Sequence, residues 1–351
     1  MENQMKERIQ PSKDEIKSLM STFGVESVSE TELIDSSHGD NDIRWNTIID
    51  KRYVLRFCNA PEMTDARMED LNRLIARYRA FGLRCPAFHR AKDGGFFRPW
   101  NDLLVYLSDY IDLPLADNKE GAEADALRDE VVCLIAEFME RYRDVDLSPT
   151  MGMYSLFDLN PYDVPEGIDE KQQNMNTLCG ALRKIGQDAL AEKLEAKNRA
   201  VRAYLLPIYR DLPHCVTQGD ENFSNVLLDE QGHFAGLIDF NLAGTDVCVN
   251  LIANNADFNL DVMHEKPIDA DKALSDAIKS YRKNAEMMLK LYHATDAERD
   301  ALPYFAWIAL ASMWPYACAF QKRIGNDECR ESTLALLERV ADLKPQALYV
   351  S

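Results

Sequence analysis

The feature that most constrains the fold is a pair of short apolar strands inside a long helical stretch. Residues 125–142, 171–185 and 188–205 carry apolar side chains at helical spacing. His214 then opens a short β-like segment, and residues 226–228 and 234–240 read as two apolar strands joined by the turn 229–232. Helical patterns return after residue 240. The sequence therefore predicts a β-hairpin set into a helical region, and polar residues gather around it.

The region before residue 112 has a different pattern. Residues 12–24 predict a helix that Ser12 caps and Gly24 ends, and residues 63–81 predict a second helix. Strands are expected at residues 25–34, 43–49, 53–57, 96–98 and 103–107. This order predicts a five-stranded antiparallel sheet that carries a helix. The fold class is α+β, with an N-terminal lobe at 1–111 and a helical C-terminal lobe at 112–351.

The charge balance excludes some classes of partner. The chain has 59 Asp and Glu residues against 40 Lys and Arg residues, a net charge of −19. Such a field repels nucleic acid and anionic membranes, so we expect neither as a partner. An acidic surface that keeps the protein in solution explains the charge, and attraction of a cationic substrate is the alternative.

Nothing in the sequence indicates secretion or membrane insertion. The first 15 residues are polar and contain no apolar stretch typical of a signal peptide. The apolar run at 304–320 is broken by Ser312 and Pro315, so it predicts a buried helix pair or one kinked helix. We expect a cytoplasmic protein.

Three polar residues around the hairpin suggest phosphoryl transfer. Asn225 follows Asp220 by five positions in a polar loop, and Asp239 ends the second strand between Ile238 and Phe240. Phosphoryl transfer requires a carboxylate near the attacking hydroxyl and hard oxygen ligands for Mg²⁺. An Asp and an Asn at this spacing arise by chance, and an Asp at a strand end often caps a turn. The complete pattern of loop, hairpin and apolar-Asp-Phe favours the functional interpretation.

The segment 214–246 resembles the motif of the aminoglycoside phosphotransferase and choline kinase superfamily, H-G-D-x-x-x-x-N followed by an I-D-[FWY] strand. The resemblance implies a protein-kinase-like two-lobed fold with ATP in the cleft. It also implies that Asp220 is the catalytic base, that Asn225 is a Mg²⁺ ligand and that Asp239 is the principal Mg²⁺ ligand. ATP and Mg²⁺ are the expected cofactors.

The resemblance also places a nucleotide site in the N-terminal lobe. Arg56 occupies the basic position on the third strand and would hold the α- and β-phosphates, which a guanidinium can grip bidentately. A solvent-facing Arg on an alternating strand is the alternative. The acid that pairs with this basic residue would be Glu69, with Asp70 as the alternative and surface solvation of either nearly as plausible.

Two further parts of the nucleotide site follow from position alone. The turn with Ser37, His38 and Gly39 lies where a phosphate-covering loop is expected, although an ordinary hairpin turn explains it equally well. Asp109 and Ile111 lie where the family's hinge binds adenine. The sequence does not distinguish ATP from GTP.

The chain departs from the family pattern at two positions. Gln218 replaces the usual His before Gly219, and a Gln amide can still form hydrogen bonds. Asn250 stands where the family often has an Asp, so a charge that supports the catalytic loop is lost. Together with Arg56, these departures keep a nucleotide-binding or scaffolding pseudokinase as the alternative function.

The predicted substrate is a small molecule with a hydroxyl group: an amino alcohol, a sugar or an aminoglycoside. A protein kinase ranks last, because no A-P-E-like segment follows Asp239. Acids and aromatic residues of the C-terminal helices could line the pocket, although Trp307 and Trp314 at helical spacing also suit a core. The candidates are Asp257, Asp261, Tyr304, Trp307, Trp314 and Tyr316. The oligomeric state is left open.

Overall fold

The computed structural model describes residues 10–37, 43–59, 63–161 and 167–350. The chain divides into two compact units. The first unit is Met1–Lys119 with Glu221–Phe240, and the second is Glu120–Asp220 with Asn241–Ser351. The hairpin segment thus groups with the N-terminal region, whereas the sequence assigned it to the C-terminal lobe. A lobe boundary at residue 111 stays a prediction.

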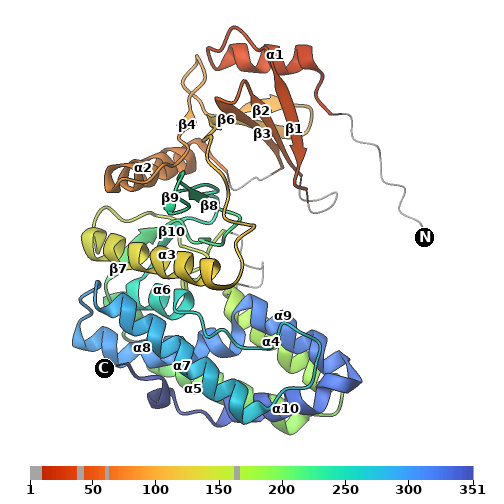
Figure 1. Ribbon diagram of the computed structural model, residues 1–351, viewed down its shortest axis with the longest axis vertical. Coiled ribbons are helices and arrows are strands. Elements are labelled where there is room, and N and C mark those ends of the chain that lie inside the picture. The colour runs from red at the N-terminus through yellow and green to blue at the C-terminus, as the bar shows by residue number, and fades with distance from the viewer. Residues whose placement is uncertain (1–9, 38–42, 60–62, 162–166, 351) are drawn as a thin grey trace. The chain divides into compact units, whose positions relative to one another are not determined.

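The first unit contains an antiparallel sheet in the order β1-β2-β3-β6-β4 (Figure 1). Strand β5 also pairs with β6, at residues 103–105, whereas β4 pairs at residues 107 and 108. Its strands are β1 (Thr31–Asp35), β2 (Arg44–Ile49), β3 (Tyr53–Cys58), β4 (Phe88–His89), β5 (Arg98–Trp100) and β6 (Leu103–Asp109). Each of the five predicted strands has a counterpart, but the first begins at Thr31 rather than at residue 25, and the one expected at 96–98 is β5 and overlaps the prediction only at Arg98. The sequence missed β4, because a strand of two residues has no alternation to detect.

Helix α1 (Lys13–Thr22) packs its apolar side on this sheet. Its N-terminus is fixed by a capping box between Ser12 and Glu15, which satisfies exposed backbone amides at the helix start. Ile16 and Met20 join Trp45 and Phe57 in one buried cluster. Burial of this apolar surface provides most of the driving force that holds the helix on the sheet.

Helix α2 (Asp65–Phe81) begins at the N-cap Thr64 and ends at Gly82, whose φ of 108° is easily reached only by glycine. The ring of Tyr78 on α2 meets that of Phe240 edge to face, with centroids 5.7 Å apart. Strands β8 (Val226–Leu228) and β9 (Phe234–Leu237) form the predicted hairpin. The backbone of Arg84 accepts from Leu237 and donates to Ala235, which fixes β9 in the first unit.

The second unit is mainly helical (Figure 1). Its helices are α3 (Gly121–Tyr142), α4 (Glu170–Lys184), α5 (Asp188–Leu205), η1 (Tyr209–Asp211), α6 (Cys248–Asn255), α7 (Ala270–Leu289), α8 (Asp296–Ser312), α9 (Trp314–Gly325), α10 (Asp327–Asp342) and η2 (Pro345–Leu348). The helices predicted at 125–142, 171–185 and 188–205 are confirmed. The apolar run at 304–320 is a helix pair, α8 and α9. None of the helices in the described ranges combines the length and the apolar composition of a membrane-spanning segment.

A two-stranded sheet in the second unit contains the strand that leads into the predicted catalytic loop. Strand β7 (His214–Thr217) pairs antiparallel with β10 (Gly244–Val247), a strand that the sequence did not reveal. Residues 150–152 lie along the other side of β10, because Thr245 donates to Thr150 and Gly152 donates to Thr245. A Cβ on Gly244 would lie 2.5 Å from the backbone of Met151, so only glycine fits there.

Candidate active site

Asn225 and Asp239 are adjacent in the first unit. They flank the hairpin, and the amide of Ile238 donates to the carbonyl of Asn225 at 3.0 Å. Asn225 is buried and Asp239 is half-buried. Asp239 has a φ of 54°, in the left-handed region that non-glycine residues rarely adopt and Asp tolerates better than most. A conformation of this kind is typical of functional sites, where the surroundings hold a side chain in place.

Arg56 faces the same carboxylate from strand β3. The antiparallel register pairs Arg56 with Tyr106 on β6. Burial opposes the charge on Arg56, but Tyr106 and Asp239 outweigh it and raise the pKa of Arg56. Burial raises the pKa of Tyr106 to about 12, although the guanidinium acts in the opposite direction. Arg56, Tyr106 and Asp239 therefore form one electrostatic cluster, and the sequence did not identify Tyr106.

This cluster suits a phosphate and a hard cation. The Nε of Arg56 is buried and finds no hydrogen-bond acceptor in the part of the chain that the structure describes. A buried guanidinium donor without an acceptor fits an anionic oxygen supplied by a ligand. Asn225 and Asp239 offer oxygen ligands of the type that Mg²⁺ prefers. Over the described ranges, no group of three or more His, Cys, Asp or Glu side chains is arranged to hold a metal ion.

The expected pair between Arg56 and Glu69 is not formed. Glu69 is 62% exposed and pairs with Arg90. The alternative acid, Asp70, pairs with Arg67 and Arg73. The carboxylate that acts on Arg56 in this structure is Asp239. Glu69 lies off the buried stripe of α2, so the helical repeat turns its side chain away from the sheet.

The hinge candidate Asp109 has a different environment from the one expected. Its carboxylate contacts Arg79 at 2.6 Å and His89 at 2.7 Å, and accepts from the amide of Ala87 at 3.0 Å. Its own amide donates to the carbonyl of Ala87. Burial opposes ionisation, but these hydrogen bonds outweigh it and lower the pKa of Asp109 to about 2. The amide and side chain of Asp109 are thus engaged within the first unit.

Of the other residues expected to bind the nucleotide, Ile111 and Ser37 lie within the described ranges. Ile111 is half-buried, and its carbonyl accepts from Leu113 at 2.9 Å. The amide of Ser37 donates to Asp35, and its hydroxyl accepts from the amide of Arg44. His38 and Gly39 lie outside the described residues. Adenine binding at Ile111 and phosphate binding at residues 37–39 stay predictions.

Asp220 lies in the second unit, directly after strand β7. The buried side chain of Gln218 accepts a hydrogen bond from the amide of Asp220 at 2.6 Å. Gly219 has a φ of 81°, and a Cβ there would lie 2.9 Å from the carbonyl of Leu242. The turn into Asp220 is therefore fixed by one side chain and one glycine. Asp220 itself is half-buried.

The residues of the second unit that were expected to line the substrate pocket differ in burial and in contacts. Trp307 is completely buried and donates to the carbonyl of Val340, so it belongs to the core. Tyr316 is also buried and donates to Asp257 at 2.5 Å. Tyr304 stacks on Tyr204. Trp314 is 61% exposed and Asp261 is exposed, so these two are accessible.

Sequence comparison assigns the chain to a protein family. The sequence profile of the phosphotransferase enzyme family matches residues 35–248, more than half of the chain. The chain belongs to this family. The search of curated protein sequences found no match.

Solved structures show the same protein-kinase-like fold. An amicoumacin kinase in complex with AMP-PNP and Ca²⁺ matches with a TM-score of 0.51 and 11% identity, over 94% of this chain and 96% of that chain. A microcompartment-associated aminopropanol kinase matches with a TM-score of 0.50 and 13% identity, over 93% and 95%. At these identities the likeness shows the fold alone.

Proposed function

We propose that this protein transfers the γ-phosphate of ATP to a hydroxyl group of a small molecule in a Mg²⁺-dependent reaction. The observation that carries the proposal is the cluster of Arg56, Tyr106 and Asp239 with Asn225 beside it. It combines an unsatisfied cationic donor with two oxygen ligands, which is the equipment that phosphoryl transfer requires. Membership of the phosphotransferase family supports the same reaction.

Each residue has a role that its chemistry supports. Arg56 binds the α- and β-phosphates, and Asn225 and Asp239 hold Mg²⁺, which when bound neutralises phosphate charge. Asp220 accepts the proton of the acceptor hydroxyl. The oxygen of that hydroxyl bonds to the γ-phosphorus, and the bond from this phosphorus to the oxygen of ADP breaks. Gln218 holds the amide of Asp220 and so orients the base.

A specific observation favours the second candidate function. Both candidate acids of α2 are paired with other residues, Glu69 with Arg90 and Asp70 with Arg67 and Arg73. A kinase fold that lacks this pair could bind a nucleotide without transferring phosphate. The pseudokinase therefore stays as the alternative.

Turnover distinguishes the two functions. ATP consumption by purified protein with Mg²⁺ should be screened against amino alcohols, sugars and aminoglycosides. We expect turnover with at least one compound and its loss in the Asp220→Ala variant. Binding of Mg·ATP without turnover of any compound would favour the pseudokinase, and failure to bind nucleotide would contradict both the kinase and a nucleotide-binding pseudokinase.

A further inference from the structure

Lys171 is a buried cation without an obvious counter-charge. It is the second residue of α4 and is 2% exposed. Its Nζ is buried and makes no hydrogen bond within the described ranges, although it lies 4.6 Å from the ring centroid of Tyr154. A buried ammonium is costly unless an acid compensates it. Because Nζ has no access to solvent, the compensating group has to come from the protein.

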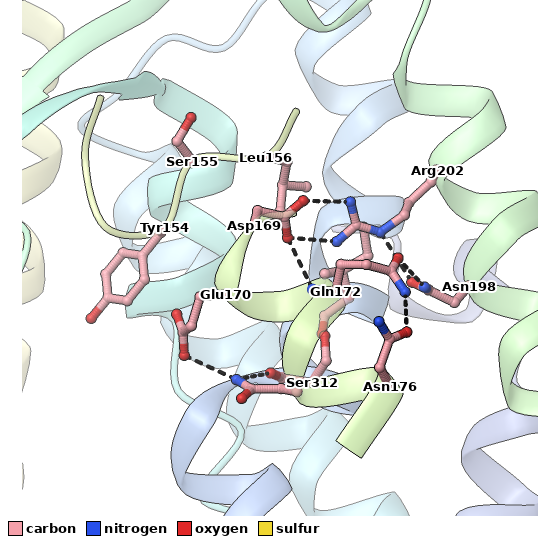
Figure 2. Close-up of polar contacts among 12 residues, drawn as sticks. Tyr154, Ser155, Leu156, Asp169, Glu170, Gln172, Asn176, Asn198, Arg202 and Ser312 are labelled. Carbon is pink, nitrogen blue, oxygen red and sulfur yellow. Dashed lines mark hydrogen bonds and ion pairs between the residues drawn. The ribbon is translucent and has the colours of Figure 1, made fainter. Parts of the chain in front are cut away.

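Two acids precede Lys171 in the sequence, and both are engaged: Glu170 accepts a hydrogen bond from Asn174 at 2.9 Å, and Asp169 has a cationic partner. Asp169 caps α4 and accepts two hydrogen bonds of 2.7 Å from the guanidinium of Arg202. It also accepts from the amide of Gln172 at 3.0 Å. Figure 2 shows this arrangement at the start of α4, with Tyr154 on the neighbouring segment. Arg202 is thus the hydrogen-bonded partner of Asp169, and Lys171 makes a smaller contribution to the lowered pKa of Asp169. A second buried acid is needed to compensate the charge of Lys171.

Asp246 on strand β10 meets this need. It is completely buried, and it accepts from the amide of Val247 at 2.7 Å and from Nδ2 of Asn250 at 2.8 Å. These donors are neutral. Burial raises the pKa of Asp246 to about 7, and the ammonium of Lys171 acts in the opposite direction. Lys171 therefore supplies positive charge to a carboxylate whose hydrogen-bond donors carry none.

The surroundings of Asp246 connect this pair to the catalytic segment. Strand β10 pairs with β7 so that Asp246 lies opposite Cys215, and β7 leads directly to Gln218. Asn250 donates both to Asp246 and to the carbonyl of Tyr154. The carboxylate of Asp246 is thus fixed between the strand that precedes the catalytic loop and the segment that Lys171 contacts.

We propose that Lys171 and Asp246 form a buried charge pair that positions strand β7 and the loop carrying Asp220. Both are positioning residues, because neither is expected to touch the substrate. The effect on catalysis rests on the proposed function, whereas the effect on strand β7 does not. The amide of Asn250 suits this arrangement, because an Asp there would place a second carboxylate beside Asp246 without a second cation.

The first test measures the position of the loop and needs no substrate. Amide hydrogen exchange in residues 214–220 should be compared in wild type, Lys171→Met, Asp246→Asn and the double variant. Each single variant leaves one buried charge without its partner, so we expect exchange to rise about tenfold or more. In the double variant both charges are absent, so the rise should be smaller than in either single variant.

A control variant shows whether the rise in exchange is specific to Lys171 or follows from removing a lysine elsewhere. Lys193 is on α5 and pairs with Glu338 and Asp342 at the surface. Lys193→Met should leave exchange in residues 214–220 unchanged. Additive effects of Lys171→Met and Asp246→Asn, or no effect of Lys171→Met, would overturn the charge pair. If neither single variant folds, folding of the double variant supports the pair and its failure to fold contradicts it.

The second test concerns catalysis. In Lys171→Met, kcat should fall about tenfold while KM for ATP stays within about twofold, because the phosphate-binding residues belong to the first unit. A purely structural role would reduce the fraction of active protein and leave kcat per active molecule unchanged. If wild type transfers no phosphate, the proposed function fails, and the exchange measurement still decides whether the charge pair exists.

Discussion

At the scale of single residues, Gln218 shows how a departure from the family motif is accommodated. Its carboxamide oxygen accepts from the amide of Asp220, so the loop keeps a buried acceptor without a His. Loss of that acceptor leaves the amide of the half-buried Asp220 without this hydrogen bond, which costs about 1 kcal/mol. The orientation of the proposed base therefore depends on a residue type that can accept this bond.

The first prediction concerns this hydrogen bond. Gln218→Leu should lower kcat about tenfold or more, because the loop loses the acceptor that orients Asp220. Gln218→His should retain kcat within about threefold, since a neutral imidazole nitrogen can accept the same bond. Steady-state kinetics on both variants checks this. Equal kcat for Gln218→Leu and wild type would show that the loop does not need the bond.

The second prediction uses the lowered pKa of Asp109. The folded-state pKa is about 2, against a usual value of 3.8, so Asp109 stabilises the fold above pH 4 and loses this contribution as pH falls toward 2. With its side chain 27% exposed, the contribution at pH 7 is about 1.5 kcal/mol after allowance for solvent screening. Asp109→Asn should therefore lower the free energy of unfolding by this amount at pH 7.

The pH dependence makes that prediction specific. Denaturant unfolding at pH 7 and pH 3 should show a smaller difference between wild type and Asp109→Asn at pH 3. The control, Asp102→Asn, changes an exposed carboxylate on the turn before β6 and should have no effect at either pH. A difference for Asp109→Asn that stays constant between the two pH values would contradict the assigned cause.

At the scale of elements, the hairpin β8–β9 carries Asn225 at one end and Asp239 beyond the other. The backbone of Gly236 lies against that of Arg84, and a Cβ at position 236 would overlap the carbonyl of Arg84. Because that neighbour is backbone, it cannot move without displacing the loop after α2. A glycine is thus required where β9 packs in the first unit.

The third prediction tests that packing. Gly236→Ala should lower the free energy of unfolding by about 3 kcal/mol through overpacking. Gly180→Ala is the matched control, because Gly180 lies inside α4 and a Cβ added there would have nothing within 4 Å, so this change should stabilise the protein by about 1 kcal/mol. Thermal or denaturant unfolding checks both. A neutral Gly236→Ala variant would mean that β9 does not approach Arg84 closely.

The elements also show how far sequence reasoning reaches. The helices α3, α4 and α5 and the hairpin follow from local periodicity, and local patterns are what a sequence displays. Strand β10 was missed because GTDV follows a turn and gains its strand character from pairing with β7, which is distant in the chain. Tyr106 was missed for a similar reason, since only the register of β6 against β3 pairs it with Arg56.

Two side chains have an environment that is set by tertiary structure: the pairing predicted for Glu69 is not found, and Lys171 was not singled out at all. The stripe of Met68, Leu71 and Tyr78 could have excluded Glu69, because it lies off the buried face of α2. Lys171 gave no such signal: a lysine in the first turn of a helix is ordinarily solvated, and its burial is set by segments far away in the sequence. The sequence places the motif residues around the hairpin, but it does not reveal their electrostatic partners.

At the scale of the whole molecule, the residues assigned to the proposed reaction are distributed between the two units of the chain. Arg56, Asn225 and Asp239 belong to the first unit and Asp220 to the second, and the chain passes from one unit to the other between Asp220 and Glu221. The net charge of −19 argues against nucleic acid as a partner, which stays a prediction. Phosphate binding in so acidic a protein depends on local cations, and Arg56 is the proposed one.

The fourth prediction, and the most direct test of the central claim, follows the γ-phosphate of labelled ATP into an acceptor. Wild type and Asp211→Ala, which removes an exposed carboxylate shortly before β7, should both transfer the label. Asp220→Ala should lose at least about 99% of the transfer while it binds Mg·ATP as wild type does, because the proton acceptor is removed and the phosphate site is not. Transfer by Asp220→Ala at the wild-type rate would contradict the assignment of the base and, with it, the proposed mechanism.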